Sequence, residues 1–123
     1  MRLNDIINRF SLLSDLSKEE VSKWTVLCVD TMKTVEGRLF SKRAAEEENN
    51  ALRLANAAAA LAFYKYTLCV PETAVKNFTA GSVTVAMAMS ERERAKTLWE
   101  EEERLCADLM RSSEDFRFLE VRV

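Results

Sequence analysis

Leu54-Ala55-Asn56-Ala57-Ala58-Ala59-Ala60-Leu61-Ala62-Phe63-Tyr64 is the stretch that decides the fold. Its apolar side chains would cover most of the circumference of a helix, and this pattern extends from about Glu46 to Cys69. A helix without a polar face belongs at the centre of a fold. Its four consecutive alanines let neighbouring helices approach closely, and Pro71 ends it. Leucines recur every seven residues and are placed to form one packing seam, made of Leu54, Leu61 and Leu68.

Two helices are expected before this central helix. Residues from Asn4 to about Leu13 carry apolar side chains at three- and four-residue spacings, which predicts a short amphipathic helix. A second helix begins at Ser17, because Ser17 and Glu20 have the spacing of a capping box. Its apolar stripe keeps the helical period to about Phe40. The polar residues from Ser41 to Ala45 indicate a loop or joint.

The chain after the central helix contains one more expected helix and two stretches that are not helical in pattern. Ser90 and Glu93 make a second capping box, and the helix behind it covers Ala95 to Met110. Between the two helices, the β-branched run Ser82 to Val85 predicts a short strand or hairpin. Residues Phe116 to Val123 resemble an extended arm. We therefore expect an all-α bundle of about four helices with a minor β element, in a single domain covering residues 1–123.

Composition excludes several classes of function. The 123 residues carry 18 basic and 20 acidic side chains, a formal net charge of -2, which gives no electrostatic footprint for a nucleic-acid backbone, so we expect no sequence-specific nucleic-acid partner. No apolar run approaches the roughly 20 residues that a membrane span requires, and the N-terminus lacks the apolar core of a signal peptide. We therefore expect a protein made in the cytosol that has no membrane partner.

Two features that often carry catalysis or hold cofactors are missing. Histidine, the commonest general base and metal ligand, does not occur in the chain. Gly37 and Gly81 are the two glycines, so neither of the usual glycine-rich phosphate loops can form. Cys28, Cys69 and Cys106 lack metal-site spacing and indicate buried thiols. The sequence predicts no enzyme, no metal site and no cofactor.

Two further groups of residues have an ordinary structural explanation. The acidic run Glu100 to Glu103 fans around a helix axis, so it indicates a solvated face, on which Glu100 would pair with Arg104. Trp24 and Trp99 lie on apolar stripes at helical spacing, which favours core packing.

Two segments are not explained by a helical core. A short strand with no partner strand in the chain leaves an open edge that another subunit can pair with. An apolar C-terminal arm would dock somewhere, either on its own chain or on another subunit. The candidate interaction residues are Phe78, Gly81, Val83 and Val85 in the first segment, and Phe116, Phe118 and Val121 in the second.

The layout as a whole is similar to a known family. The order is a short helix, a long capped helix, the alanine-rich helix ending Ala62-Phe63-Tyr64-Lys65-Tyr66, the segment Phe78-Thr79-Ala80-Gly81-Ser82-Val83-Thr84-Val85, a last helix, and Asp115-Phe116-Arg117-Phe118. This arrangement resembles the small head-tail connector proteins of tailed bacteriophages and prophages. Ser82 stands where those proteins usually carry an acidic residue.

The resemblance implies a structural virion protein. Copies would form a ring homo-oligomer on the phage portal protein and offer a platform to a tail-side adaptor, with DNA passing through the lumen. Phe78 to Val85 would contact a neighbouring subunit or the portal, and the arm from Phe116 an adjacent component. The protein would be in the bacterial cytoplasm during assembly and then in the virion. The alternative is a small cytosolic regulatory or antitoxin-like helical module that binds one partner protein.

Overall fold

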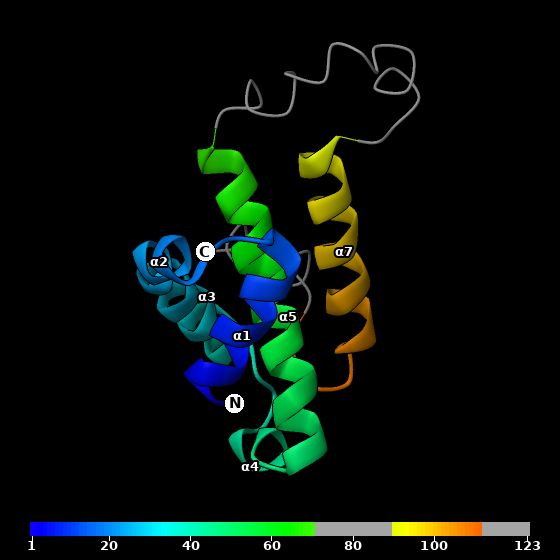
Figure 1. Cartoon of the computed structure of the whole chain (residues 1–123). Helices are drawn as coiled ribbons and strands as arrows, with labels where there is room; N and C mark the ends of the chain where they lie inside the picture. The colour runs from blue at the N-terminus through cyan, green and yellow to red at the C-terminus, as the bar shows by residue number, and fades with distance from the viewer. Residues whose placement is uncertain (71–89, 112–123) are drawn as a thin grey trace, which may run out of the picture.

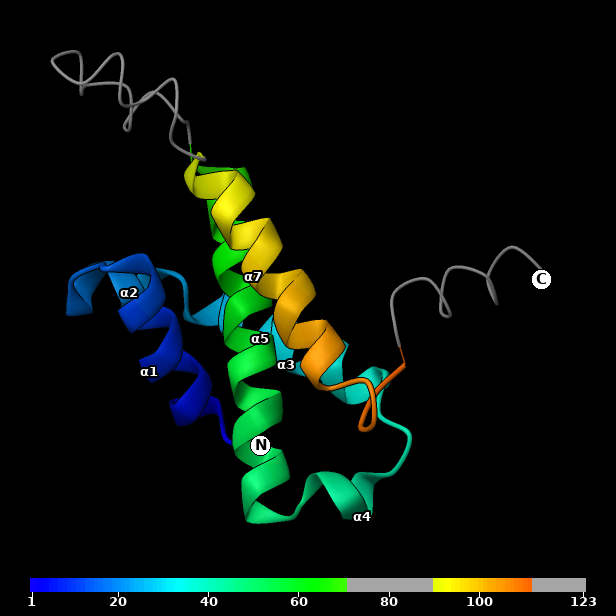
Figure 2. The ribbon, with the colours of Figure 1, turned by 90° about the vertical axis from the view of Figure 1, so that its right-hand side faces the viewer.

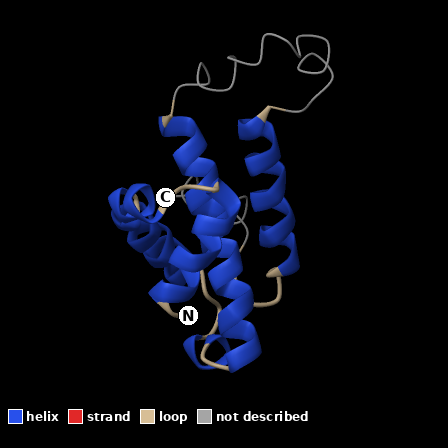
Figure 3. Ribbon diagram, in the orientation of Figure 1, coloured by secondary structure: helices blue, strands red, loops and turns tan. Residues whose placement is uncertain are grey.

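The computed structural model describes residues 1–70 and 90–111. These residues are helical, as the sequence predicts, and none of them belongs to a β-strand (Figures 1 and 3). The helices of this part of the chain are α1 (Leu3–Ser14), α2 (Lys18–Lys23), α3 (Thr25–Gly37), α4 (Lys42–Ala45), α5 (Glu48–Cys69) and α7 (Glu91–Leu105). The expected strand at Ser82 to Val85 and the arm from Phe116 lie outside the described residues.

α5 is the central helix, as its composition predicts. α1 and α3 pack against it and α7 runs antiparallel to it, so the middle of α5 has helices on more than one side (Figures 1 and 2). Its four consecutive alanines, Ala57 to Ala60, are at most 1% exposed. The expected leucine seam is correct for two of its members. Leu54 and Leu61 are buried, whereas Leu68, in the last turn of α5, is 49% exposed.

The expected helix from Ser17 to Phe40 is broken at Trp24. Ser17 caps the start as predicted, and its Oγ accepts a hydrogen bond of 3.3 Å from the Glu20 N–H. The helix α2 then ends at Lys23 and α3 begins at Thr25. We attribute the break to packing, because the Trp24 ring meets the Tyr66 ring of α5 edge-on with the centroids 4.9 Å apart. A tertiary contact thus overrides the helical period.

Residues Ser41 to Ala45, predicted to be a loop, contain the one-turn helix α4. Ser41 accepts a hydrogen bond of 3.2 Å from the Ala44 N–H and so caps this turn. α5 consequently begins at Glu48, two residues later than expected. The Asn50 side chain donates to the Ala44 carbonyl at 2.9 Å and thereby joins the first turn of α5 to α4.

The last helix begins where its capping box predicts and ends five residues earlier than expected. α7 starts after Ser90, whose Oγ accepts from the Glu93 N–H at 3.1 Å as the capping box predicts. It ends at Leu105 and not at Met110. Met110 instead forms an isolated antiparallel bridge with Leu39, so the chain after α7 lies beside the chain after α3 (Figure 2). None of the helices in the described ranges combines the length and apolar content needed to cross a bilayer.

Candidate protein-interaction site

All seven candidate interaction residues lie outside the described residues, in 71–89 and 112–123. The structure does describe the places where these two segments join the helices. We call the first the loop junction, made of Tyr66, Thr67, Val70, Ser90 and Arg92. We call the second the tail junction, made of Arg38, Arg53, Glu103 and residues 105–111.

The loop junction brings the end of α5 and the start of α7 into direct contact. The Arg92 guanidinium of α7 donates to the Thr67 carbonyl of α5 at 3.3 Å. This carbonyl belongs to the last turn of α5, where carbonyls lack partners within the helix. The Val70 N–H donates to the Tyr66 carbonyl at 3.1 Å and closes the same turn. Residues 71–89 therefore leave and re-enter the helical body at neighbouring points.

An aromatic cluster stabilises α5 beside the loop junction. Tyr66 meets Phe10 of α1 edge-on at a centroid distance of 5.9 Å and lies nearly parallel to Phe63 at 6.5 Å. Together with the Trp24 contact, these pairs tie α1 and the α2–α3 break to α5. Burial raises the pKa of the Tyr66 hydroxyl, and the carboxylates of Glu91 and Glu20 raise it further. The phenol therefore stays neutral at physiological pH.

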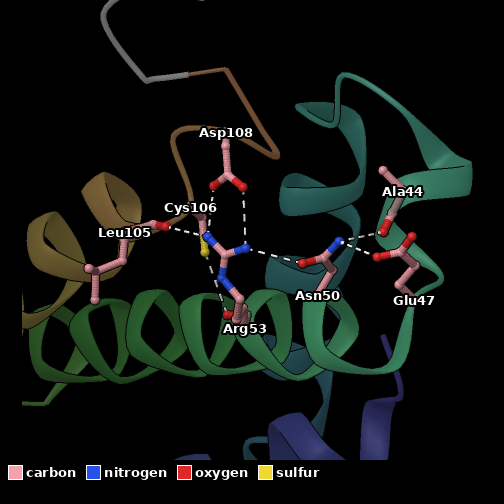
Figure 4. Close-up of polar contacts among 7 residues, drawn as sticks. All are labelled: Ala44, Glu47, Asn50, Arg53, Leu105, Cys106 and Asp108. Atoms are coloured by element: carbon pink, nitrogen blue, oxygen red, sulfur yellow. Dashed lines mark hydrogen bonds and ion pairs between the residues drawn. The ribbon is translucent and has the colours of Figure 1, made fainter.

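The tail junction is centred on Arg53, which α5 directs towards the end of α7 (Figure 4). Its Nη2 donates to the Leu105 carbonyl at 2.6 Å and to Asp108 Oδ1 at 2.7 Å, and its Nη1 donates to Asp108 Oδ2 at 3.3 Å. The two terminal nitrogens of one guanidinium thus bind the Asp108 carboxylate, and one of them also binds the carbonyl of Leu105, the last residue of α7. The hydrogen bond from Arg53 lowers the pKa of the Asp108 carboxyl.

The same guanidinium connects the tail junction to α4. Arg53 Nη1 donates to Asn50 Oδ1 at 3.1 Å, and Asn50 in turn donates to the Ala44 carbonyl and to Glu47 (Figure 4). Cys106 Sγ lies 3.6 Å from the Arg53 carbonyl as a weak donor, and burial raises the pKa of its thiol. The turn after α7 is therefore fixed to α5 by both side chains and backbone.

Arg38 is the second arginine of the tail junction and is only 7% exposed. Its Nη2 pairs with Glu103 of α7, and its Nε donates to the Arg111 carbonyl at 2.7 Å. The guanidinium carbon lies 5.6 Å from the centroid of the Trp99 ring, within cation–π distance. The Arg111 N–H returns a hydrogen bond of 2.8 Å to the Arg38 carbonyl. Arg38 thus fixes the last described residue, Arg111, beside the end of α3.

Sequence reasoning missed both arginines and both of their carboxylate partners, Glu103 and Asp108. Glu103 was predicted to lie on a solvated face, but its side chain is 18% exposed and paired with Arg38. Arg104 pairs with Glu101 at 2.6 Å and not with Glu100. One signal was present in the sequence, because Arg53 is a lone cation between Leu52 and Leu54 in an otherwise apolar stretch.

The cysteines and tryptophans are placed largely as predicted. Cys28 and Cys106 are buried, and burial raises the pKa of the Cys28 thiol to about 11. Cys69, the last residue of α5, is exposed, contrary to prediction. Trp99 is 7% exposed and belongs to the core, whereas Trp24 is half-buried and packs against the core from its edge. Within 1–70 and 90–111, no group of three or more Cys, Asp or Glu residues is arranged to hold a metal ion.

No protein-family model, curated protein or solved structure matches the chain.

Proposed function

We propose that the chain is a head-tail connector of a tailed bacteriophage or prophage, which assembles as a ring on the portal and binds a tail-side adaptor. In this proposal the helices are the scaffold. A short β element within 71–89 and an extended arm within 112–123 make the contacts between proteins.

The observation that carries the proposal is the loop junction. The contact between Arg92 and the Thr67 carbonyl places the facing ends of α5 and α7 together, so a few residues would suffice to connect them. Helix connections in bundles usually have about 2–8 residues. The connection here spans 71–89, which is far longer than closure requires. Insertions of this length between packed helices are commonly functional, and this one contains the Phe78 to Val85 segment.

The tail junction supports the second half of the proposal. The guanidinium groups of Arg38 and Arg53 both bind residues 105–111, the turn that follows from the last residue of α7. Fixing this turn sets the point and direction from which residues 112–123 leave the body. A fixed departure point lowers the entropy that an arm loses when it binds a partner.

The surface charge is compatible with the proposal. A net charge of -2 gives a ring little general attraction for phosphates, so DNA could slide through its lumen. The missing histidine and glycine-rich phosphate loops also agree with a structural protein.

The test is imaging of the protein mixed with the portal protein of the same phage genome. The parent chain is expected to attach as a ring to the tail-side rim of the portal. The double variant Val83→Glu, Val85→Glu is expected to stay folded by circular dichroism and to lose attachment, because two charges on one strand face prevent β-addition. Normal rings from this variant would contradict the assignment of the segment.

A matched control places two charges on the scaffold. Val26 is 78% exposed on α3 and Thr34 is exposed on the same helix, so Val26→Glu, Thr34→Glu should leave attachment unchanged. If the parent chain binds no portal and instead forms a one-to-one complex with another cytosolic protein, the regulatory or antitoxin-like alternative replaces the connector.

A further inference from the structure

The residues after α7 form a turn whose inner side is buried. Cys106 and Met110 are 1% exposed and Leu109 is 6% exposed, so these side chains belong to the core although they lie outside the helices. The two residues between Cys106 and Leu109 are exposed. We call residues 106–111 the latch. Part of the core is thus carried by a turn and not by a helix.

The end of the latch is attached to the chain that follows α3. The Phe40 N–H donates to the Leu109 carbonyl at 3.0 Å, and the Arg111 N–H donates to the Arg38 carbonyl at 2.8 Å. Arg38 Nε donates in the other direction, to the Arg111 carbonyl at 2.7 Å. Each of these hydrogen bonds joins two separate segments, so their loss leaves the hydrogen bonds within the helices intact.

The start of the latch is attached to α5 by an exposed ion pair. Arg53 binds Asp108, and the two side chains are 39% and 63% exposed. An ion pair with this exposure contributes little to stability and is screened by salt. The middle of α5 is different, because Ala57 to Ala60 are at most 1% exposed. Segments held by exposed contacts open at lower free energy than the packed core, so the latch can open while the helices stay packed.

The guanidinium that holds the latch also supports α4. Arg53 Nη1 donates both to Asp108 Oδ2 at 3.3 Å and to Asn50 Oδ1 at 3.1 Å. Asn50 in turn donates to the Ala44 carbonyl of α4 at 2.9 Å (Figure 4). Asp108 therefore helps to hold the guanidinium where it meets Asn50. These side chains form one continuous chain of hydrogen bonds from the latch to α4.

We propose that the latch opens as one unit while α3, α5 and α7 stay packed, and that its opening loosens α4. Opening exposes the side chains of Cys106, Leu109 and Met110. Because coupling between two sites is reciprocal, a protein that holds the latch open also changes α4, and one that binds α4 changes the latch. This inference goes beyond the proposed function, because it concerns two conformations of the subunit alone.

The first test compares two buried thiols of the full chain. Cys106 lies in the latch and Cys28 lies in α3, and they are 1% and 0% exposed. The folded chain is treated with excess iodoacetamide, and alkylation of each thiol is followed by peptide mass mapping. Cys106 should react at least about tenfold faster, because it is reached without unfolding of the helices. Equal rates at the two cysteines would overturn the proposal, because both would then react through global unfolding.

Urea below the unfolding transition distinguishes local from global opening. The rate at Cys28 should rise steeply with urea, because global unfolding exposes a large surface. The rate at Cys106 should change little, because opening of a six-residue turn exposes a small one. The same steep dependence at both thiols would contradict a latch that opens by itself.

A matched pair of variants on α5 tests what holds the latch. Arg53→Met removes the Asp108 pair and the bond to the Leu105 carbonyl, and should accelerate alkylation of Cys106 about tenfold. Lys65→Met is the control, because Lys65 pairs with Asp30 at a similar exposure, 35% and 61%, away from the latch. It should leave the rate at Cys106 unchanged. Equal rates in the two variants would show that Arg53 does not hold the latch.

Tryptic cleavage after Lys42 and Arg43 tests the coupling to α4, because a protease cuts the open form of a helix. Asp108→Ala changes the latch and leaves Asn50 intact, and should accelerate these cleavages about threefold, as loss of an exposed ion pair allows. Asp30→Ala removes the other pair and should leave them unchanged. The coupling is refuted if the two variants are cut in α4 at the same rate. None of these measurements involves a portal protein, so their failure leaves the proposed function standing.

Discussion

The two ends of the helical body are held together by different forces. Towards the loop junction, Tyr66 contacts Phe10 and Trp24 through ring edges, and these contacts depend on apolar burial. At the tail junction, Arg53 and Arg38 bind carboxylates and backbone carbonyls. The free energy of apolar burial has no preferred direction and is not screened by salt. Charged hydrogen bonds, by contrast, fix the orientation of the two groups and require both to be ionised or polar. The aromatic end therefore supplies stability, and the arginine end supplies orientation.

The largest effect should come from the aromatic end. Phe10 is fully buried, and Phe10→Ala should lower the free energy of unfolding by about 3–5 kcal/mol, the usual effect of removing a buried ring. Urea denaturation measures this change. Leu12→Ala on the same helix is the control, because Leu12 is 75% exposed, and its effect should stay within about 0.5 kcal/mol. Equal effects of the two variants would refute the assigned packing of α1.

A smaller loss should follow from breaking the buried pair at the arginine end. Arg38→Met removes the ion pair between Arg38 and the partly buried Glu103 carboxylate and should lower the unfolding free energy by about 2–3 kcal/mol. Adding Glu103→Gln should recover part of the loss, because the carboxylate that faced Arg38 is then replaced by a neutral amide. The control is Lys33→Met at an exposed position of α3, which should change the unfolding free energy little. Additive effects of the first two substitutions would show that the pair contributes no coupling.

The sequence predicts some features of these two ends and not others. The central position of α5 follows from its missing polar face, and the starts of α2 and α7 follow from Ser17 and Ser90. Such features are local, because the residues that decide them are neighbours in the chain. The break at Trp24 was missed because its cause, the Tyr66 ring, is distant in sequence.

The tail junction shows the same limit more clearly. Arg53 binds Asp108, and Arg38 pairs with Glu103, at separations of 55 and 65 residues. Helical spacing alone placed Glu103 in solvent, because it gives no information on which charged residue meets a partner from another helix. The seven candidate interaction residues lie outside the described residues and stay predictions.

A modest gain in stability should come from Gly37, beside Arg38. A Cβ built on Gly37 meets nothing within 4 Å, and its φ is not positive. Gly37→Ala should therefore raise the unfolding free energy by about 0.5 kcal/mol, chiefly by restricting the unfolded chain. A loss of stability in thermal denaturation would show that the arginine end needs the freedom of glycine.

The smallest effect should be that of Asp108, whose carboxylate is exposed. Arg53 lowers its pKa below the ordinary 3.8, so its contribution is present above pH 3.8 and is lost as pH falls through the lowered value. The difference in melting temperature between the parent and Asp108→Asn should be small at pH 7 and vanish in acid. It should also shrink in about 1 M salt. A difference that persists in strong acid would contradict an ionic origin.

Hydrogen exchange of the full chain, alone and bound to the portal protein of the same phage genome, tests the central claim most directly. If the helices are scaffold and the two segments bind, exchange should slow in residues 71–89 and 112–123 and stay unchanged in α1, α3 and the middle of α5. Slowing confined to the outer faces of α1 and α3, with both segments unaffected, would contradict the account.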